Sequence, residues 1–171
     1  MENITLIGMP GSGKSTVGVL LAKFLGYGFL DVDLIIQQRE QALLQDIIDK
    51  RGVSAFLDCE EAAVCSLNCT NHVIAPGGSA VLRETAAAHL KSLGPVVYLN
   101  VPLEELAQRI QNMSTRGIAM EKGQTLADVM AARTPLYQQY ADLFIDCSGN
   151  QSLAQTAQII LERLKEYQLG R

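Results

Sequence analysis

No apolar run in this 171-residue chain reaches the roughly 20 residues that a membrane-spanning helix needs. No basic segment precedes its first apolar stretch, which follows Met1-Glu2-Asn3, so no secretory signal peptide is predicted. We therefore expect a cytoplasmic protein. A chain of this length is sufficient for one hydrophobic core, and it contains no internal repeat or linker that would divide it. The prediction is a single domain over residues 1–171 that acts as a monomer.

The chain also lacks an excess of positive charge. It has 14 Lys and Arg against 18 Asp and Glu, which gives a formal net charge of −4. An acidic protein has no general attraction to nucleic acid or to an anionic membrane, so we expect neither as a partner. Local positive groups must overcome this background if the protein binds a polyphosphate.

The four cysteines lack the spacing of a zinc or redox motif, and they are Cys59, Cys65, Cys69 and Cys147. Cys65 and Cys69 are four residues apart and could share a helix face. Small apolar side chains in a reducing compartment are the favoured interpretation of all four. His72 and His89 are isolated, so neither is favoured as a ligand or a base.

Short apolar segments alternate with helical patterns along the chain. Strands are predicted at 3–9, 29–32, 72–75, 96–100 and 143–146. Helices are predicted at 14–25, 33–51 with a break near 37–40, 53–67, 82–93, 102–113, 125–140 with an interruption at Pro135, and after Ser152, which starts a capping box. This alternation predicts an α/β protein with a parallel sheet covered on both faces. Residues 114–124 have no clear period and are interpreted as a mobile loop inside the domain.

The segment at 8–15, Gly-Met-Pro-Gly-Ser-Gly-Lys-Ser, matches the phosphate-binding pattern G-x-x-x-x-G-K-[ST] in full. Glycines let backbone N–H groups approach phosphate oxygens, and the following helix directs its N-terminal dipole at the same anion. Lys14 is predicted to reach the β- and γ-phosphates, and Ser15 to bind Mg²⁺. A chance Gly-rich turn is the alternative, but the motif lies between a strand and a helix, as phosphate binding requires. The predicted nucleotide-binding residues of the loop are Gly11, Ser12, Gly13, Lys14, Ser15 and Thr16.

Switch GTPases and motor ATPases usually hold Mg²⁺ through an acid at the end of a later strand. Here the strand at 72–75 runs into Pro76-Gly77-Gly78, and no Asn-Lys-x-Asp motif follows. The acids instead follow the second strand, at Asp31 and Asp33. If that strand continues, both carboxylates lie on one side of it, at the edge where ligands bind. One can then orient Mg²⁺ and the other a substrate hydroxyl, which favours a small-molecule kinase. The alternative for Asp33 is a helix N-cap.

Further elements occur in order along nearly the whole chain. They are Phe56 with Glu60, Gly77-Gly78-Ser79, the strand at 96–99 followed by Pro102, Arg109, Arg116 in the loop at 114–124, and Arg133-Thr-Pro-Leu-Tyr137. Together with the phosphate loop and Asp31-x-Asp33, they resemble the shikimate kinase family. The resemblance implies a three-layer P-loop α/β fold with a five-stranded parallel sheet and a small lid at about 114–124. It implies ATP and Mg²⁺ as cofactors and phosphoryl transfer to a ring hydroxyl of shikimate, in aromatic amino acid biosynthesis.

The resemblance also implies roles for single residues. Asp33 would hold and polarise the attacking hydroxyl, backbone amides of Gly77 and Gly78 would line the substrate pocket, and Arg133 would pair with the substrate carboxylate. On the nucleotide side, Arg109 would stack on adenine, and Arg116 would swing in with the lid to neutralise the transferring phosphoryl group. Without the resemblance, solvated surface charge would be the favoured interpretation of Arg116 and Arg133.

One departure from the family concerns the acceptor. The family usually has Arg directly after the Phe of the third helix, where it grips the carboxylate, and this chain has Leu57. Asp58, Glu60 and Glu61 make the same stretch acidic, unless Lys50 or Arg51 substitutes for the missing cation. A charge-assisted contact of this type contributes roughly 1.5–3 kcal/mol. The alternatives to shikimate phosphorylation are therefore a related kinase for another polyol or sugar acid such as gluconate, and a nucleotide-binding regulator without transfer activity.

Overall fold

The computed structural model of the chain describes residues 2–111, 117–149 and 151–170. Its strands form a parallel sheet in the order β2-β3-β1-β4-β5. They are Ile4–Ile7 (β1), Gly28–Asp31 (β2), His72–Ala75 (β3), Val96–Asn100 (β4) and Leu143–Asp146 (β5). The predicted parallel sheet is confirmed, and β3, β4 and β5 have the predicted bounds.

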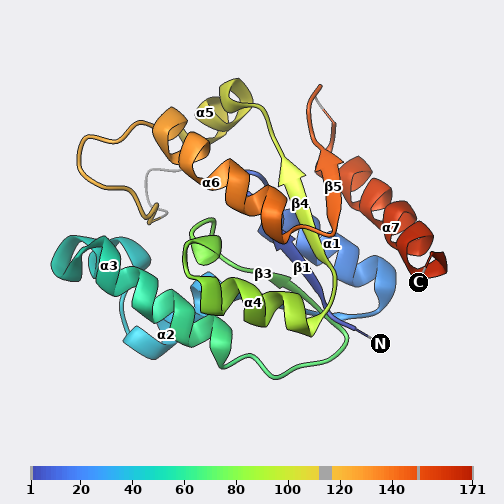
Figure 1. The fold of residues 1–171 in the computed structure, drawn as a ribbon, viewed down its shortest axis with the longest axis horizontal. Coiled ribbons are helices and arrows are strands. Elements are labelled where there is room, and N and C mark those ends of the chain that lie inside the picture. Colours follow the sequence, from blue (N-terminus) through green and yellow to red (C-terminus); the bar gives the residue numbers. More distant parts are fainter. Residues whose placement is uncertain (1, 112–116, 150, 171) are drawn as a thin grey trace.

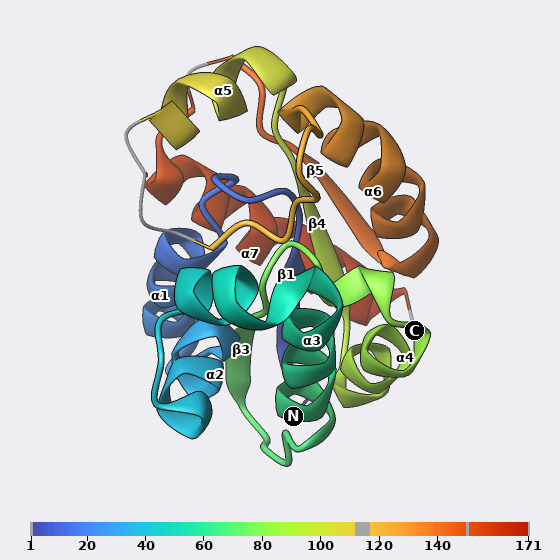
Figure 2. The ribbon, with the colours of Figure 1, turned by 90° about the vertical axis from the view of Figure 1, so that its left-hand side faces the viewer.

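Helices cover both faces of the sheet, as the alternation predicted (Figure 1). Helices Lys14–Leu25 (α1) and Leu153–Leu169 (α7) pack against each other on one face. Helices Glu84–Leu93 (α4) and Leu126–Tyr140 (α6) cover the other. Helices Val32–Glu40 (α2) and Leu44–Cys65 (α3) pack together beside α4, and Leu103–Gln111 (α5) follows β4 (Figure 2).

The core explains why the strands are apolar without alternation. Leu6 of β1, Val97 of β4 and Ala157 of α7 are fully buried in one cluster of apolar side chains. A second cluster joins α2, α3 and α4 and includes Ile74 of β3. Because both faces of a parallel sheet are covered, both sets of side chains along a central strand are buried. The sheet is therefore rigid, and its carboxyl edge can hold loops in fixed positions.

The helix boundaries correct three details of the prediction. The segment at 33–51 is interrupted at Gln41, which has a left-handed φ of 51°, rather than at 37–40. By contrast, the kink inside α3 at Gly52, which has φ 86° and ψ 168°, confirms the break predicted between the helices at 33–51 and 53–67. Pro135 does not interrupt α6, because packing of that helix against β4 and α4 outweighs the loss of one backbone hydrogen bond. A short 3₁₀ helix at Ala80–Leu82 (η1) precedes α4 and was not predicted.

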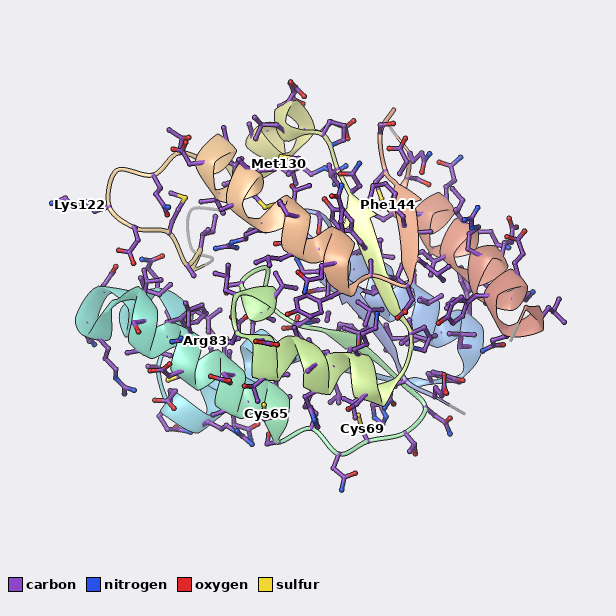
Figure 3. The ribbon with its side chains drawn as sticks, in the orientation of Figure 1. Cys65, Cys69, Arg83, Lys122, Met130 and Phe144 are labelled. Atoms are coloured by element: carbon purple, nitrogen blue, oxygen red, sulfur yellow. The ribbon has the colours of Figure 1, made fainter. Side chains whose placement is uncertain are left out.

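The positions of the cysteines differ from the one arrangement that would have allowed a metal site, a helix face shared by Cys65 and Cys69. Cys65 is the last residue of α3, and Cys69 lies in the loop beyond it, so the two do not share a helix face (Figure 3). All four cysteines are free, and the described part of the chain contains no group of three or more His, Cys, Asp or Glu that could hold a metal ion. None of the helices formed by the described residues is long and apolar enough to cross a membrane.

Candidate active site

The phosphate loop lies between β1 and α1, at the carboxyl edge of the sheet. Lys14 begins α1, and its Nζ donates hydrogen bonds to the carbonyl oxygens of Gly8 at 2.9 Å and Met9 at 3.0 Å. Gly13 has a left-handed φ of 92°, and a Cβ added there would lie 2.9 Å from Leu153 Cδ2. Glycine is therefore required at this position for both backbone and space. The loop encloses the lysine side chain, which is only 8% exposed.

Burial changes the protonation of Lys14. It lowers the pKa of the ammonium to about 8, Asp33 acts in the opposite direction, and the Arg133 guanidinium lowers the pKa further. Lys14 therefore remains mostly protonated near neutral pH but loses its charge more readily than an exposed lysine. An anion beside it would restore the charge, which fits a site for polyphosphate.

Two oxygen ligands for a hard cation lie next to the loop. The Ser15 hydroxyl donates to Asp31 Oδ2 at 2.8 Å, and the Asp33 amide donates to Asp31 Oδ1 at 3.0 Å. Hydroxyl and carboxylate oxygens are the protein ligands that Mg²⁺ prefers, so Ser15 and Asp31 fit a magnesium site. The condition that the strand continues to Asp33 is not met, because Asp31 ends β2 and caps α2. The N-cap is thus Asp31, and Asp33 lies in the first helical turn.

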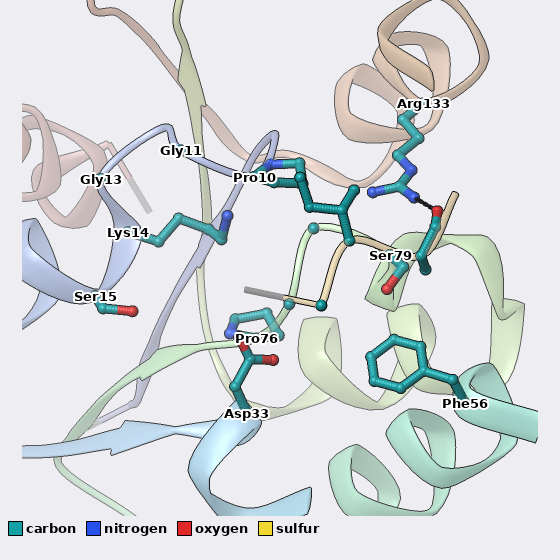
Figure 4. A pocket seen from close by; sticks show the side chains of 15 residues that line it. Pro10, Gly11, Gly13, Lys14, Ser15, Asp33, Phe56, Pro76, Ser79 and Arg133 are labelled. Carbon is teal, nitrogen blue, oxygen red and sulfur yellow. Dashed lines mark hydrogen bonds between the residues drawn. The ribbon is translucent and has the colours of Figure 1, made fainter. Parts of the chain in front are cut away.

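A small cavity lies beside the loop, and side chains from four helices reach it (Figure 4). Its charged lining residues are Lys14 from α1, Asp33 from α2 and Arg133 from α6, and Phe56 from α3 forms an apolar wall. Arg133 is 3% exposed and donates from Nη2 to the Ala119 carbonyl at 2.6 Å. A base, two cations and an apolar wall therefore surround one small space.

The turn after β3 forms another wall of the cavity. Gly77 and Gly78 both line it, together with Pro76 and Ser79. A Cβ added to Gly78 would lie 2.7 Å from Pro10 Cδ, so the turn packs directly on the phosphate loop. The absence of side chains lets this backbone approach both the loop and a ligand.

Glu60 lies behind this turn, and sequence reasoning gave it no role. It is 1% exposed, and its Oε2 accepts a hydrogen bond from the Ser79 hydroxyl at 2.6 Å. Its Oε1 has no hydrogen-bond partner among the described residues. Burial raises the pKa of Glu60 to about 7, the Ser79 hydrogen bond opposes this, and the Asp33 charge adds to it. The charge of Glu60 is therefore costly at neutral pH.

The predicted nucleotide side is only partly described. Arg109 lies beside the phosphate loop, where Nη1 donates to the Gly11 carbonyl at 3.4 Å and Nη2 pairs with Glu105 at 3.2 Å. Thr16 is exposed on α1 and does not line the cavity. Arg116 and the first part of the predicted lid lie outside the described residues. Of the rest of the lid, residues 117–119 line the cavity.

Leu57 does not line this cavity. It is half-buried and lines a neighbouring hollow, which Ala119 and Arg133 also line. Leu57 is therefore next to Arg133 in a hollow that adjoins the cavity, but it is not part of the cavity lining.

The charges near Leu57 have local partners. Arg83 donates to Asp58 at 2.5 Å and lies 4.0 Å from Glu61, so these two acids face away from the cavity. Arg51 pairs with Glu40 and does not line the cavity. The described residues thus show no second cation that replaces the missing arginine beside Arg133.

Comparison with known proteins accounts for this arrangement. The model of the shikimate kinase family matches residues 10–165. A shikimate kinase of Paracidovorax citrulli is 37% identical over 95% of this chain and 92% of its own length. One from Pseudomonas paraeruginosa is 38% identical over 97% of this chain and 98% of its own. The solved structure of an Acinetobacter baumannii shikimate kinase in complex with shikimate has a TM-score of 0.89 at 34% identity, and covers 99% of this chain and 96% of that one.

The predicted five-stranded parallel sheet with its covering helices matches the fold of the solved shikimate kinases. The similarity extends over nearly the whole of each protein. The chain is therefore a member of the shikimate kinase family of ATP-dependent small-molecule kinases.

Proposed function

We propose that this protein transfers the γ-phosphoryl group of ATP to a ring hydroxyl of shikimate. The observation that carries the proposal is the meeting of Lys14, Asp33 and Arg133 at one cavity beside a complete phosphate loop. This arrangement provides a site for phosphate, a base for a hydroxyl and a cation for a carboxylate. Shikimate carries both a hydroxyl and a carboxylate.

In the proposed reaction, the acceptor oxygen forms a bond to the γ-phosphorus as the bond to the β–γ bridging oxygen breaks. ADP leaves, and the proton of the hydroxyl passes to the Asp33 carboxylate and then to solvent. Phosphoryl transfer depends mainly on positioning and on neutralising charge. Lys14, held by Gly8 and Met9, supplies fixed positive charge next to the transferred group.

We assign the magnesium ion to Ser15 and Asp31, because their oxygens lie together at the entrance to the loop. Magnesium neutralises phosphate charge when it is bound. Arg109, which contacts the Gly11 carbonyl, is proposed to stack on the adenine, and Arg116 is proposed to act from the lid. Arg133 would pair with the acceptor carboxylate, and the turn at Gly77 and Gly78 would supply backbone amides.

A second candidate is phosphorylation of another polyol or sugar acid. Leu57 favours it, since the carboxylate would have one arginine instead of two, and buried Glu60 adds negative charge behind the pocket. Both candidates use the same nucleotide site and differ only in the acceptor.

The test is a coupled ADP-release assay with shikimate, gluconate and related hydroxy acids. We expect turnover with shikimate, and none when Lys14→Met removes the ammonium from the phosphate site. Turnover with gluconate and none with shikimate would favour the second candidate. A Lys14→Met variant with wild-type nucleotide affinity and turnover would contradict the assignment of this cavity as the kinase site.

A further inference from the structure

Tyr137 connects three parts of the site without lining its cavity. It lies one turn after Arg133 on α6 and is 1% exposed. Its hydroxyl donates to the Gly78 carbonyl at 2.5 Å and lies 3.9 Å from Met9 Sδ in the phosphate loop. A single phenol thus contacts the glycine turn and the phosphate loop from the helix that carries Arg133.

The hydrogen bond from Tyr137 fixes the orientation of the peptide bond between Gly78 and Ser79. Tyr137 is not among the residues that line the cavity, so it holds the Gly78 carbonyl from behind the wall. In a trans peptide, C=O and N–H point in opposite directions, and the described residues contain no cis peptide. The Ser79 amide, which belongs to the same peptide as the Gly78 carbonyl, therefore points away from the Tyr137 hydroxyl, and Ser79 itself lines the cavity. Within the described part of the chain, no hydrogen bond from this amide is found.

The phenol is a fixed donor. Its ring stacks on Tyr98, with centroids 5.1 Å apart and planes at 27°. Burial raises the pKa of Tyr137 above its usual value, while the charge and hydrogen bond of Arg133 act against this. Tyr137 thus stays protonated over the range in which a kinase works, and it can hold the Gly78 carbonyl throughout.

We propose that Tyr137 is a positioning residue for the acceptor. By holding the Gly78 carbonyl it turns the Ser79 amide into the cavity, where the amide donates a hydrogen bond to an oxygen of the acceptor. The inference rests on the proposed function only in that an acceptor fills this cavity. It assigns part of acceptor affinity to a residue that does not contact the acceptor.

The test compares Tyr137→Phe with Tyr98→Phe. Both variants keep the stacked rings and lose one buried hydroxyl, but the Tyr98 hydroxyl bonds to Asn100 Oδ1 at 3.1 Å rather than to the turn. We expect Tyr137→Phe to raise the acceptor KM about tenfold, with kcat and the KM for ATP within twofold of wild type. Tyr98→Phe should leave all three within twofold. Thermal denaturation of both variants separates lost stability from lost affinity.

The kinetic test uses whichever acceptor the wild-type protein phosphorylates, so absence of turnover with shikimate contradicts only the proposed function. The amide spectrum of ¹⁵N-labelled protein requires no acceptor. In it, Tyr137→Phe should shift the Ser79 resonance, and Tyr98→Phe should not. An unchanged Ser79 resonance in folded Tyr137→Phe would overturn the proposal, and so would equal rises in the KM of acceptor and ATP.

Discussion

The hydroxyl of Ser15 and the carboxylate of Asp31 meet at 2.8 Å, although they lie on different elements. Ser15 is in the first turn of α1, and Asp31 ends β2. The start of α1 and the end of β2 thereby bring two oxygen ligands together beside the phosphate loop. A magnesium ion held by both would neutralise phosphate charge during transfer.

We therefore expect Asp31→Asn to weaken magnesium binding without unfolding the protein. Asparagine keeps an oxygen for the Asp33 amide, so the cap of α2 is preserved. Loss of one anionic ligand should raise the Mg²⁺ concentration for half-maximal activity about tenfold, which corresponds to ~1.4 kcal/mol. The measurement is a magnesium titration at saturating ATP. Asp49→Asn, on the exposed side of α3, is the control, and equal behaviour of the two variants would remove Asp31 from the metal site.

Glu60 gives a prediction about stability and pH. Its pKa is raised to about 7 in the folded protein from 4.5, because the carboxyl group is buried. The unfolded chain then loses this proton first as pH rises, so the free energy of unfolding falls between about pH 4.5 and 7. Glu60→Gln removes the titration. From pH 4.5 to pH 8, the stability of the variant relative to wild type should rise by about 3 kcal/mol.

Urea denaturation of both proteins at intervals across this range measures the effect. The contribution of protonated Glu60 is fully present below about pH 4.5 and is lost by the time the pH passes 7. Curves of stability against pH that stay parallel for wild type and Glu60→Gln would show that Glu60 is not a buried acid in solution.

The sequence predicted the parts of the site whose residues are adjacent in the chain. The loop at 8–15 is contiguous, so its spacing alone specified Lys14 and Ser15. The place of Asp33 at the cavity was also predicted, but from an extended strand, whereas the protein presents it on a helix. Cap geometry decided the difference, because Asp31 accepts a hydrogen bond from the Asp33 amide and the helix begins at Val32.

The remaining contacts depend on residues far apart in the sequence. Tyr137 and Gly78 are separated by 59 positions, and Glu60 and Ser79 by 19. Hydrophobic periodicity along the sequence cannot indicate such a pair, because each contact depends on how α6 and α3 pack over the sheet. A tyrosine or a glutamate on an amphipathic helix is consistent with many environments, and only the packed structure distinguishes among them.

Gly117 gives a prediction about the described part of the lid. A Cβ added to it would lie 2.7 Å from Leu44 Cβ and 2.9 Å from the backbone nitrogen of Gln45, so the segment rests directly on the start of α3. Gly117→Ala should push this segment outward and move the Ala119 carbonyl away from Arg133.

The expected result is a rise of several-fold in the acceptor KM with little loss of thermal stability. Steady-state kinetics and thermal denaturation measure the two effects. Gly170→Ala is the matched control, because its added Cβ would meet only ordinary contacts, at 3.7 Å or more. If the acceptor KM of Gly117→Ala equals that of the control, the segment does not rest on α3 during turnover.

Leu57 gives the prediction that bears most directly on the acceptor. It lines a hollow that Arg133 shares, so Leu57→Arg would place a second guanidinium beside the first. A carboxylate gripped by both arginines gains about 1.5–3 kcal/mol. We therefore expect the KM for shikimate to fall at least tenfold.

Val53→Arg is the control. Val53 lines the same hollow one helical turn before Leu57, and the substitution adds the same charge as Leu57→Arg. A larger effect from Leu57→Arg than from Val53→Arg would show that position 57 is oriented toward the carboxylate. Equal effects of the two variants on the KM for shikimate would show only that added positive charge attracts the anionic substrate. Such attraction acts over a distance of about the Debye length, which becomes shorter as the salt concentration rises. A KM for shikimate that stays the same or rises in Leu57→Arg, beside good turnover of gluconate by wild type, would mean that this pocket has been adapted to a different hydroxy acid.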